Sequence, residues 1–283
     1  MGKIHVVTDS TAYLPMELIQ EHGIHVVPLR VNMEGVSLRE GMDITNAEFF
    51  RRLRTAKTLP TTSQPPAGEF AALYQELGRQ GASIVSIHIS GDLSGTVAAA
   101  ETARRMLPDL DIHILDSRFT CMGLGFIVLE AARAAAENAP LEAVLERCRT
   151  IIRDLKAFFM VDSLRYLYKG GRIGAAQTLV GSMLQVKPIL GLKDEEGVIS
   201  VHEKVRTKKK ALERIVELTA EACAGKDKVT ATVVDADDKE TSGRLQQLLR
   251  EAVPQAKVIP SEFGPVVGNH VGPGAAGIIF YTV

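Results

Sequence analysis

The stretch Ser90-Gly91-Asp92-Leu93-Ser94-Gly95-Thr96 combines hydroxyl and glycine residues at a spacing suited to binding an anion. It follows a run of strand-forming residues, 83–89, and precedes an alanine-rich helical pattern, 97–107. At such a junction the first N–H groups of the helix have no internal partners, and the helix dipole adds a partial positive charge. Gly91 and Gly95 let the backbone turn sharply, and Ser94 adds a hydroxyl. The alternative is that Ser94 only caps the helix.

Two other predicted strands end in residues of the same kind. Asp9-Ser10-Thr11 follows the first strand, and Asp116-Ser117 follows the strand predicted at 112–115. In open α/β sheets ligands bind at the carboxyl ends of strands, where these residues would lie. Asp9 and Asp116 are candidates for a carboxylate pair that binds metal or transfers protons. Aspartates beside serine at strand ends more often fix loops by hydrogen bonds, and we favour that role.

The remaining candidates for chemistry give weaker signals. Five histidines lie within strands or beside a helix-ending glycine, without metal-ligand spacing, and we favour structural roles for them: His5, His22, His25, His88 and His113. His270 differs because it follows a glycine-rich turn. An enzyme, either a hydrolase or a phosphotransferase using Asp9, Ser94 or His270, is the alternative function. The sequence has no G-x-S-x-G elbow, P-loop or metal-binding cluster to support it.

Composition narrows the class of protein. The chain has 283 residues, 46% of them hydrophobic, which is enough for two α/β domains. A net charge of −1 gives no general reason to bind nucleic acid. The three cysteines are widely spaced, so neither a disulfide framework nor a zinc site is indicated. The N-terminus enters a strand pattern without a signal peptide, and no apolar run is long enough to span a membrane, so we expect a cytoplasmic protein.

The first half of the chain alternates strand and helix patterns around these residues. We predict strands at 4–8, 24–31, 83–89 and 112–115, a hairpin turning at Glu34-Gly35, and helices at 15–22, 47–57, 67–80, 97–107, 122–138 and 140–156. Thr45 and Glu48 form a capping box, and residues 59–66 are read as a proline-stiffened loop with free hydroxyls. This alternation favours a mainly parallel sheet with helices on both faces, over residues 1–159.

The second half, residues 160–283, is predicted as a second α/β domain. We expect strands at 157–161, 187–190, 198–201, 229–234, 257–260 and 278–283, helices at 164–169 and 240–253, a further helix opened by Arg206-Thr207-Lys208-Lys209-Lys210, and a glycine-rich turn at 262–270. The basic run is a candidate phosphate or partner surface, although such runs are usually solvated faces.

Several of these segments together resemble one bacterial family, DegV, over the whole chain. The matching segments are Val7-Thr8-Asp9-Ser10-Thr11, Thr61-Thr62-Ser63-Gln64-Pro65, Leu93-Ser94-Gly95-Thr96, Leu115-Asp116-Ser117, Tyr168-Lys169-Gly170-Gly171-Arg172-Ile173, Lys187-Pro188-Ile189, Glu262-Phe263-Gly264-Pro265 and His270. The resemblance implies a fatty-acid-binding protein of two α/β domains, the second a two-layer sandwich, with the acyl chain in a tunnel between them. It also implies a carrier without a cofactor of its own, which presents the fatty acid to an ATP-dependent kinase related to dihydroxyacetone kinases for phospholipid synthesis.

The resemblance also implies roles for particular residues. Thr61, Thr62, Ser94, Gly95 and His270 would bind the fatty acid carboxylate. Arg172 would serve presentation to the kinase, with Arg206 and Lys208 as a further docking surface, and ligand exchange would involve transient membrane contact. The alternative for Arg172 is a salt bridge between the domains. A sensor of cellular lipid is a third possible function.

Physical chemistry is consistent with a long acyl ligand. Burying a chain of about fifteen CH₂ groups yields on the order of 12 kcal/mol, at about 0.8 kcal/mol for each group. Hydroxyl and amide donors must offset the desolvation of the carboxylate. The low aromatic content of 5% suits a cavity lined by aliphatic side chains. Phe126, Ile127, Met183 and Leu184 are candidate liners, although for each of them we favour a place in the hydrophobic core.

Overall fold

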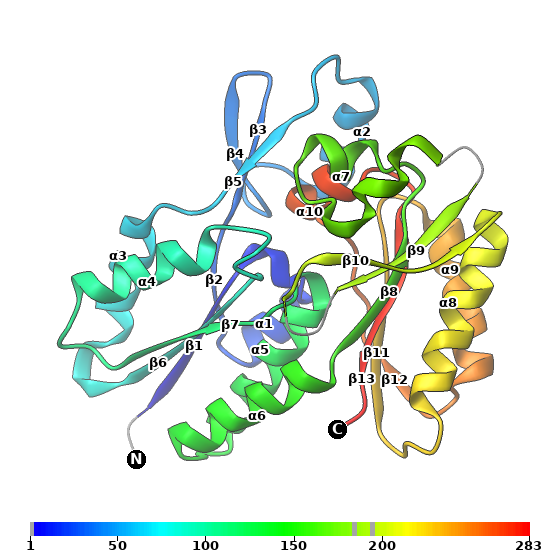
Figure 1. Cartoon of the computed structure of the whole chain (residues 1–283). Coiled ribbons are helices and arrows are strands. Elements are labelled where there is room, and N and C mark those ends of the chain that lie inside the picture. Colours follow the sequence, from blue (N-terminus) through cyan, green and yellow to red (C-terminus); the bar gives the residue numbers. More distant parts are fainter. Residues whose placement is uncertain (1–2, 183–185, 193–195) are drawn as a thin grey trace.

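Four parallel strands form the first sheet. The computed structural model describes residues 3–182, 186–192 and 196–283, and Figure 1 shows their arrangement. The sheet has the order β2-β1-β6-β7, with β1 (Ile4–Asp9), β2 (His25–Val27), β6 (Ser83–His88) and β7 (Ile112–Asp116). Because the strands are parallel, the carboxyl ends of β1, β6 and β7 meet at one edge of the sheet.

Helices cover both faces of this sheet, as predicted. On one face lie α3 (Ala67–Leu77) and α4 (Thr96–Met106), whose apolar residues share a core cluster with β1, β2, β6 and β7. On the other lies α5 (Cys121–Ala136), with α6 (Leu141–Asp154) packed against it. This half also contains α1 (Met16–Glu21) and the single 3₁₀ turns η1 (Ser10–Ala12) and η2 (Arg79–Gly81).

A small antiparallel sheet projects from the first half, with the order β4-β3-β5 (Figure 1). Its strands are β3 (Arg30–Met33), β4 (Val36–Arg39) and β5 (Thr61–Ser63), and α2 (Asn46–Thr55) follows β4. Two predictions are corrected here. The single strand predicted at 24–31 is divided at Pro28, which has no N–H to continue a ladder. The loop predicted at 59–66 contains β5, which pairs with β3.

Six strands form the larger sheet of the second half, in the order β10-β9-β8-β13-β11-β12. They are β8 (Lys156–Met160), β9 (Lys187–Leu192), β10 (Ile199–Val205), β11 (Val229–Asp235), β12 (Ala256–Val258) and β13 (Ala276–Tyr281). Two amphipathic helices, α8 (Lys208–Cys223) and α9 (Lys239–Ala252), cover its outer face in a second core cluster. This is a two-layer arrangement, as predicted.

One more prediction is corrected in the segments that lie between the sheets. Here lie α7 (Arg165–Lys169), the 3₁₀ segment η3 (Gly174–Ser182) and α10 (Pro265–Val271). The stretch predicted as a glycine-rich turn at 262–270 is largely α10. Pro265 occupies the first helical position, where its missing N–H costs nothing, and Gly268 packs against the ring of Phe50. Tertiary contact therefore holds a helix in a sequence of low helix propensity.

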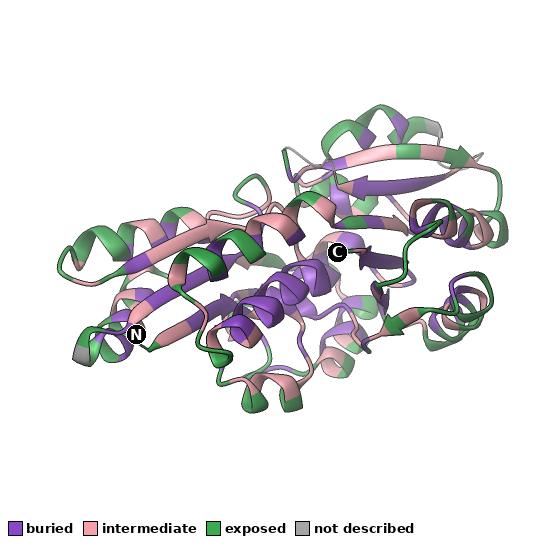
Figure 2. Cartoon of the chain, turned by 90° about the horizontal axis from the view of Figure 1, so that it is seen from below, coloured by how far each residue is buried: buried purple, intermediate pink, exposed green. Residues whose placement is uncertain are grey.

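The main core continues across both halves of the molecule. One cluster of buried side chains extends from Val6 in β1 to Tyr281 in β13 and includes most of α5. Figure 2 shows the buried residues gathered where the halves meet, while the outer helices carry the exposed ones. The predicted boundary between residues 159 and 160 falls inside β8, which pairs with β9 and β13.

Candidate functional site

Asp9 fixes the loops at the carboxyl edge of the first sheet. One carboxylate oxygen accepts hydrogen bonds from the backbone N–H and the hydroxyl of Thr11. The other accepts one from the backbone N–H of Ile89 at 2.9 Å and lies 3.1 Å from Nδ1 of His88. Asp9 is fully buried, so both oxygens are committed to this network, in agreement with the favoured loop-fixing role.

Asp116 acts in the same way on the neighbouring loop. It accepts hydrogen bonds from the backbone N–H groups of Gly91 and Arg118, at 3.2 and 2.8 Å. The Ser90 loop is further held by Ser90 N–H donating to the carbonyl of Phe119 and Ser94 N–H donating to the carbonyl of Ser90. Ser94 is thereby placed by contacts of its backbone, which do not involve its hydroxyl.

The Ser94 hydroxyl does not cap α4. The N-cap residue of that helix is Gly95, which makes no side-chain capping bond, and Oγ of Ser94 lies 2.8 Å from Oγ1 of Thr96. Ser94 lines a cavity between the two halves, which we call the inner cavity. The structure therefore does not give Ser94 the capping role considered as its alternative.

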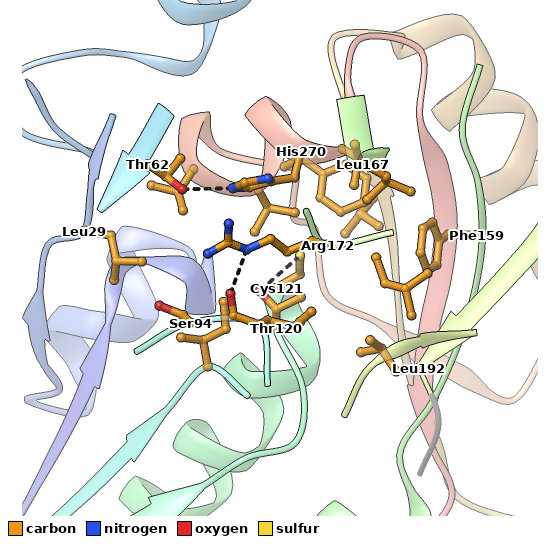
Figure 3. A pocket seen from close by; sticks show the side chains of 18 of the residues that line it. Leu29, Thr62, Ser94, Thr120, Cys121, Phe159, Leu167, Arg172, Leu192 and His270 are labelled. Carbon is orange, nitrogen blue, oxygen red and sulfur yellow. Dashed lines mark hydrogen bonds between the residues drawn. The ribbon is translucent and has the colours of Figure 1, made fainter. Parts of the chain in front are cut away.

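The inner cavity is apolar over most of its wall. Its liners include Leu29, Ile89 and Leu93 from the first half and Ala157, Phe159, Leu192, Ile199, Val234 and Ile279 from the six-stranded sheet. The empty space among its lining atoms, including solvent at the opening, is about 940 Å³. Figure 3 shows Thr62, Ser94, Arg172 and His270 toward one side and Phe159 and Leu192 toward the other.

Thr62 and His270 join the two halves at the polar end of the inner cavity. Oγ1 of Thr62 in β5 lies 2.9 Å from Nε2 of His270 in α10. Nδ1 of His270 is buried and has no hydrogen-bond partner among the described residues. Burial, and secondarily the charge of Arg172, lowers the pKa of His270 to about 4. The imidazole is therefore neutral at pH 7.

Arg172 connects the segment after α7 with the Ser94 loop. Its Nε donates to the carbonyl of Leu93 at 3.0 Å, and its Nη1 donates to the carbonyl of Gly170 at 2.7 Å. The contact to Leu93 crosses between the halves, so Arg172 has a structural part as well as a place at the cavity wall. The interdomain contact considered in the alternative is a hydrogen bond to a carbonyl rather than a salt bridge.

Other side chains closely approach two glycines at this site. A Cβ at Gly95 would collide with the side-chain amide of Gln64, and a Cβ at Gly170 would collide with the imidazole of His270. Gln64 lines the inner cavity and had not been singled out from the sequence. The glycines beside Ser94 and Arg172 were the signal that other groups pack closely there.

Other predicted site residues lie elsewhere. Thr61 is exposed and does not line the inner cavity. It lines a neighbouring cavity, to which Thr62 and His270 also contribute. Arg206 is exposed, and Lys208 forms ion pairs with Asp238 and Asp162, at 2.8 and 3.5 Å. Neither Arg206 nor Lys208 is among the residues that line the inner cavity.

None of the four candidate acyl-chain liners is among the described residues that line the inner cavity. Phe126 and Ile127 are buried core residues of α5 and are not among the residues that line the inner cavity. Met183 and Leu184 lie outside the described residues. The apolar liners from the six-stranded sheet and α10 include Phe159, Leu192 and Val267, none of which the sequence singled out.

Glu40 supports α10 and was missed by the sequence analysis. Its Oε1 accepts hydrogen bonds from the backbone N–H of Val266, at 2.7 Å, and from the hydroxyl of Tyr13, at 2.9 Å. Burial raises the pKa of Glu40 to about 7, although hydrogen bonds from Ser10, Val266 and Tyr13 act in the opposite direction. Glu40 thus holds the helix that carries His270, and no sequence motif marks it.

The other histidines have structural contacts. His88 connects Asp9 to Ser86 and, through Ser86, to Tyr74 inside the first domain, with all four side chains buried. His113 pairs with Asp111, and His5 with His25. Among the residues that the structure describes, no group of three or more histidine, cysteine or acidic side chains could hold a metal ion. No helix in that part of the chain is long and apolar enough to span a membrane.

The sequence of this chain is similar to those of known proteins. A family model described as an uncharacterised protein of the DegV family matches residues 3–283. A DegV domain-containing protein of Listeria innocua is 42% identical over 277 residues, covering 98% of this chain and 97% of the relative. Protein DegV of Bacillus subtilis is 39% identical over 276 residues, covering 97% and 98%.

Solved structures show the same fold. A Thermus thermophilus DegV family protein, described as fatty acid binding, superposes with a TM-score of 0.94 at 35% identity, covering 99% of this chain and 100% of the other. DegV of Bacillus subtilis, described as a fatty acid binding protein, gives 0.91 at 37% identity with full coverage of both chains. A stearic acid-binding protein of Eubacterium ventriosum gives 0.90 at 26% identity, covering 100% and 98%.

Proposed function

The chain belongs to the DegV family, and on that premise we propose that it binds one long-chain fatty acid in the inner cavity and presents the carboxylate to an ATP-dependent fatty acid kinase. The observation that carries the proposal is the division of the cavity wall. Aliphatic and aromatic side chains form most of it, and hydroxyl and imidazole groups gather at one side. This arrangement matches a long apolar chain with a single polar head.

The Thr62–His270 pair suits a carboxylate ligand. Because the imidazole is neutral, one of its nitrogens carries a proton. With that proton on Nε2, Thr62 Oγ1 accepts from His270 and its own O–H is free to donate to the carboxylate. Ser94 supplies a second hydroxyl, and the amide of Gly95 lies beside it. Such donors offset the several kcal/mol that desolvating a carboxylate costs.

A carrier fits the contacts better than an enzyme. In the alternative function, a hydrolase or phosphotransferase would use Asp9, Ser94 or His270. Asp9 lines a different cavity, shared with Glu40 and Lys239, and both of its oxygens are occupied by hydrogen bonds within the protein. We therefore assign phosphorylation to a separate kinase of the dihydroxyacetone-kinase type. We place the carrier in the cytoplasm, where it loads and unloads by transient membrane contact and supplies acyl phosphate for phospholipid synthesis.

The direct test is to identify what the purified protein contains. After denaturation and solvent extraction, mass spectrometry should find a fatty acid at nearly one per chain. Protein freed of lipid should then bind a long-chain fatty acid in a calorimetric titration with one site. Absence of binding in that titration would reject the proposal. The kinase role is tested separately, by measuring ATP-dependent acyl phosphate formation with a dihydroxyacetone-kinase-like partner and with the carrier omitted as control.

A further inference from the structure

A second cavity adjoins the polar end of the inner cavity, and we call it the outer cavity. The two share three residues, Thr62, Arg172 and His270, so these side chains form the wall between them. Thr61 and Lys169, both exposed, line only the outer cavity. A group attached to a carboxylate at this wall would therefore extend into the outer cavity.

The charge of the outer cavity favours an anion. Lys169 and Arg172 line it, and its described lining contains no aspartate or glutamate. Lys169 forms no ion pair within the described part of the chain, so its positive charge is not neutralised by a neighbour. Thr61 and Tyr166 add hydroxyl groups. Two cations with hydroxyl donors and no opposing carboxylate are the usual surroundings of a phosphate group.

The two neighbouring threonines of β5 differ in the cavities that they line. Side chains alternate between the faces of a strand, and of this pair only Thr62 lines the inner cavity, whereas both line the outer one. The hydroxyl of Thr61 is an acceptor for Asn32 Nδ2 at 3.5 Å, which leaves its own proton free to donate. Thr61 is thus suited to a group outside the carboxylate position rather than to the carboxylate.

We infer that the outer cavity is a subsite for the phosphoryl group of an acyl phosphate, bound by Lys169 and Thr61 while Arg172 stands between phosphoryl group and carboxylate. The inference rests on the proposed function, because it takes the acyl carboxylate to lie at the Thr62–His270 wall. It gives the Lys169 side chain a role in binding the phosphoryl group. It also reassigns Thr61 from carboxylate binding to phosphoryl binding. The same chemistry would suit free inorganic phosphate, so the test must separate the two sources.

Three probes distinguish the possibilities by calorimetry: hexadecanoic acid, 2-oxoheptadecylphosphonate as a stable acyl phosphate analogue, and inorganic phosphate. Lys169→Ala and Thr61→Val should each weaken phosphonate binding, by about tenfold for the lysine, and leave hexadecanoic acid binding within about twofold. Added salt should weaken phosphonate binding more than fatty acid binding. Lys257→Ala is the matched control, since Lys257 is exposed on β12 at the far edge of the larger sheet.

The outcomes separate this inference from the proposed function. If the protein binds hexadecanoic acid and the phosphonate, but neither variant weakens phosphonate binding, the subsite is wrong while the proposed function stands. If protein loaded with hexadecanoic acid binds inorganic phosphate as tightly as the phosphonate and through Lys169, the outer cavity serves free phosphate and the acyl phosphate assignment is wrong. If neither lipid binds, the proposed function itself fails.

Discussion

Oγ1 of Thr62 lies 2.9 Å from Nε2 of His270, although 208 residues separate the two in the chain. Thr62 belongs to β5 of the small projecting sheet, and His270 to α10, which packs beside α7 and α2. The pair closes the polar end of the inner cavity and forms part of the wall toward the outer one. The contact between the two halves and the polar end of the inner cavity are therefore formed by the same side chains.

Removing a hydroxyl at the polar end should weaken fatty acid binding. Thr62→Val and Ser94→Ala each take away one donor and leave the buried carboxylate short by a hydrogen bond, at a cost of about 1–3 kcal/mol. The dissociation constant should rise by about 5- to 150-fold in a titration of lipid-free protein. Ser37→Ala, an exposed serine of β4, is the control. Parent-like affinity in both variants would place the carboxylate elsewhere.

Arg172→Ala should affect phosphorylation more than ligand retention. The variant loses the hydrogen bonds to the carbonyls of Leu93 and Gly170, worth about 1 kcal/mol each, so we expect a drop of a few degrees in melting temperature. Acyl phosphate formation with a kinase at saturating fatty acid should fall by more than about tenfold, because the guanidinium at the wall between the cavities is gone. If the melting temperature falls strongly while the folded fraction still supports normal phosphorylation, Arg172 has only a structural role.

Gly170→Ala tests the position of His270 without touching a functional group. The added Cβ would collide with the imidazole, so the His270 side chain must shift from its position beside Thr62. Because the backbone at Gly170 is in the ordinary helical region, alanine causes no backbone strain there. We expect weaker fatty acid binding with little loss of helix content by circular dichroism. Gly68→Ala in α3, where the new Cβ meets nothing within 4 Å, should bind like the parent.

Glu40 should make stability fall as the pH rises. Its pKa is about 7 in the folded protein against an ordinary value of 4.5, so between these values the unfolded chain loses the proton first and is favoured. At about 1.4 kcal/mol for each pH unit the loss reaches about 3 kcal/mol. Glu40→Gln should therefore gain stability relative to the parent from pH 4.5 to 7 in urea unfolding. The exposed Glu17→Gln should not. If the difference in unfolding free energy between Glu40→Gln and the parent stays the same from pH 4.5 to 7, burial does not raise the pKa of Glu40.

His270 should have the opposite effect over nearly the same range. Its pKa is about 4 in the folded protein and ordinarily 6.5, so below pH 6.5 the unfolded chain takes up a proton that the folded chain excludes. The contribution is complete above pH 6.5 and is lost as the pH falls toward 4. His270→Gln should therefore become more stable relative to the parent as the solution is acidified, whereas the exposed His202→Gln should follow the parent. A parallel pH dependence of His270→Gln and parent would contradict a neutral, buried imidazole.

Local sequence patterns were enough to predict most of the elements. The turn at Glu34-Gly35, with both residues at positive φ, and the Thr45 cap on the N–H of Glu48 depend on neighbours in the chain, and both are confirmed. The strands and helices around the Ser94 loop are confirmed for the same reason. Failures came where the pattern was short: β5 has three residues and exists through its pairing with β3, and α10 depends on Glu40 and Phe50.

The sequence by itself determined the loops that could bind an anion, because strand ends, glycines and hydroxyls are readable from adjacent residues. Only the tertiary structure decided which of them meet. Thr62, Ser94, Arg172 and His270 come together through packing between segments far apart in the chain. Thr62 lines both cavities, whereas Thr61 lines only the outer one. The pKa values of Glu40 and His270 could not be predicted from the sequence either, since each depends on burial by distant segments. Contacts over such separations have no local signal, because they are fixed by how whole elements pack rather than by what neighbouring residues prefer.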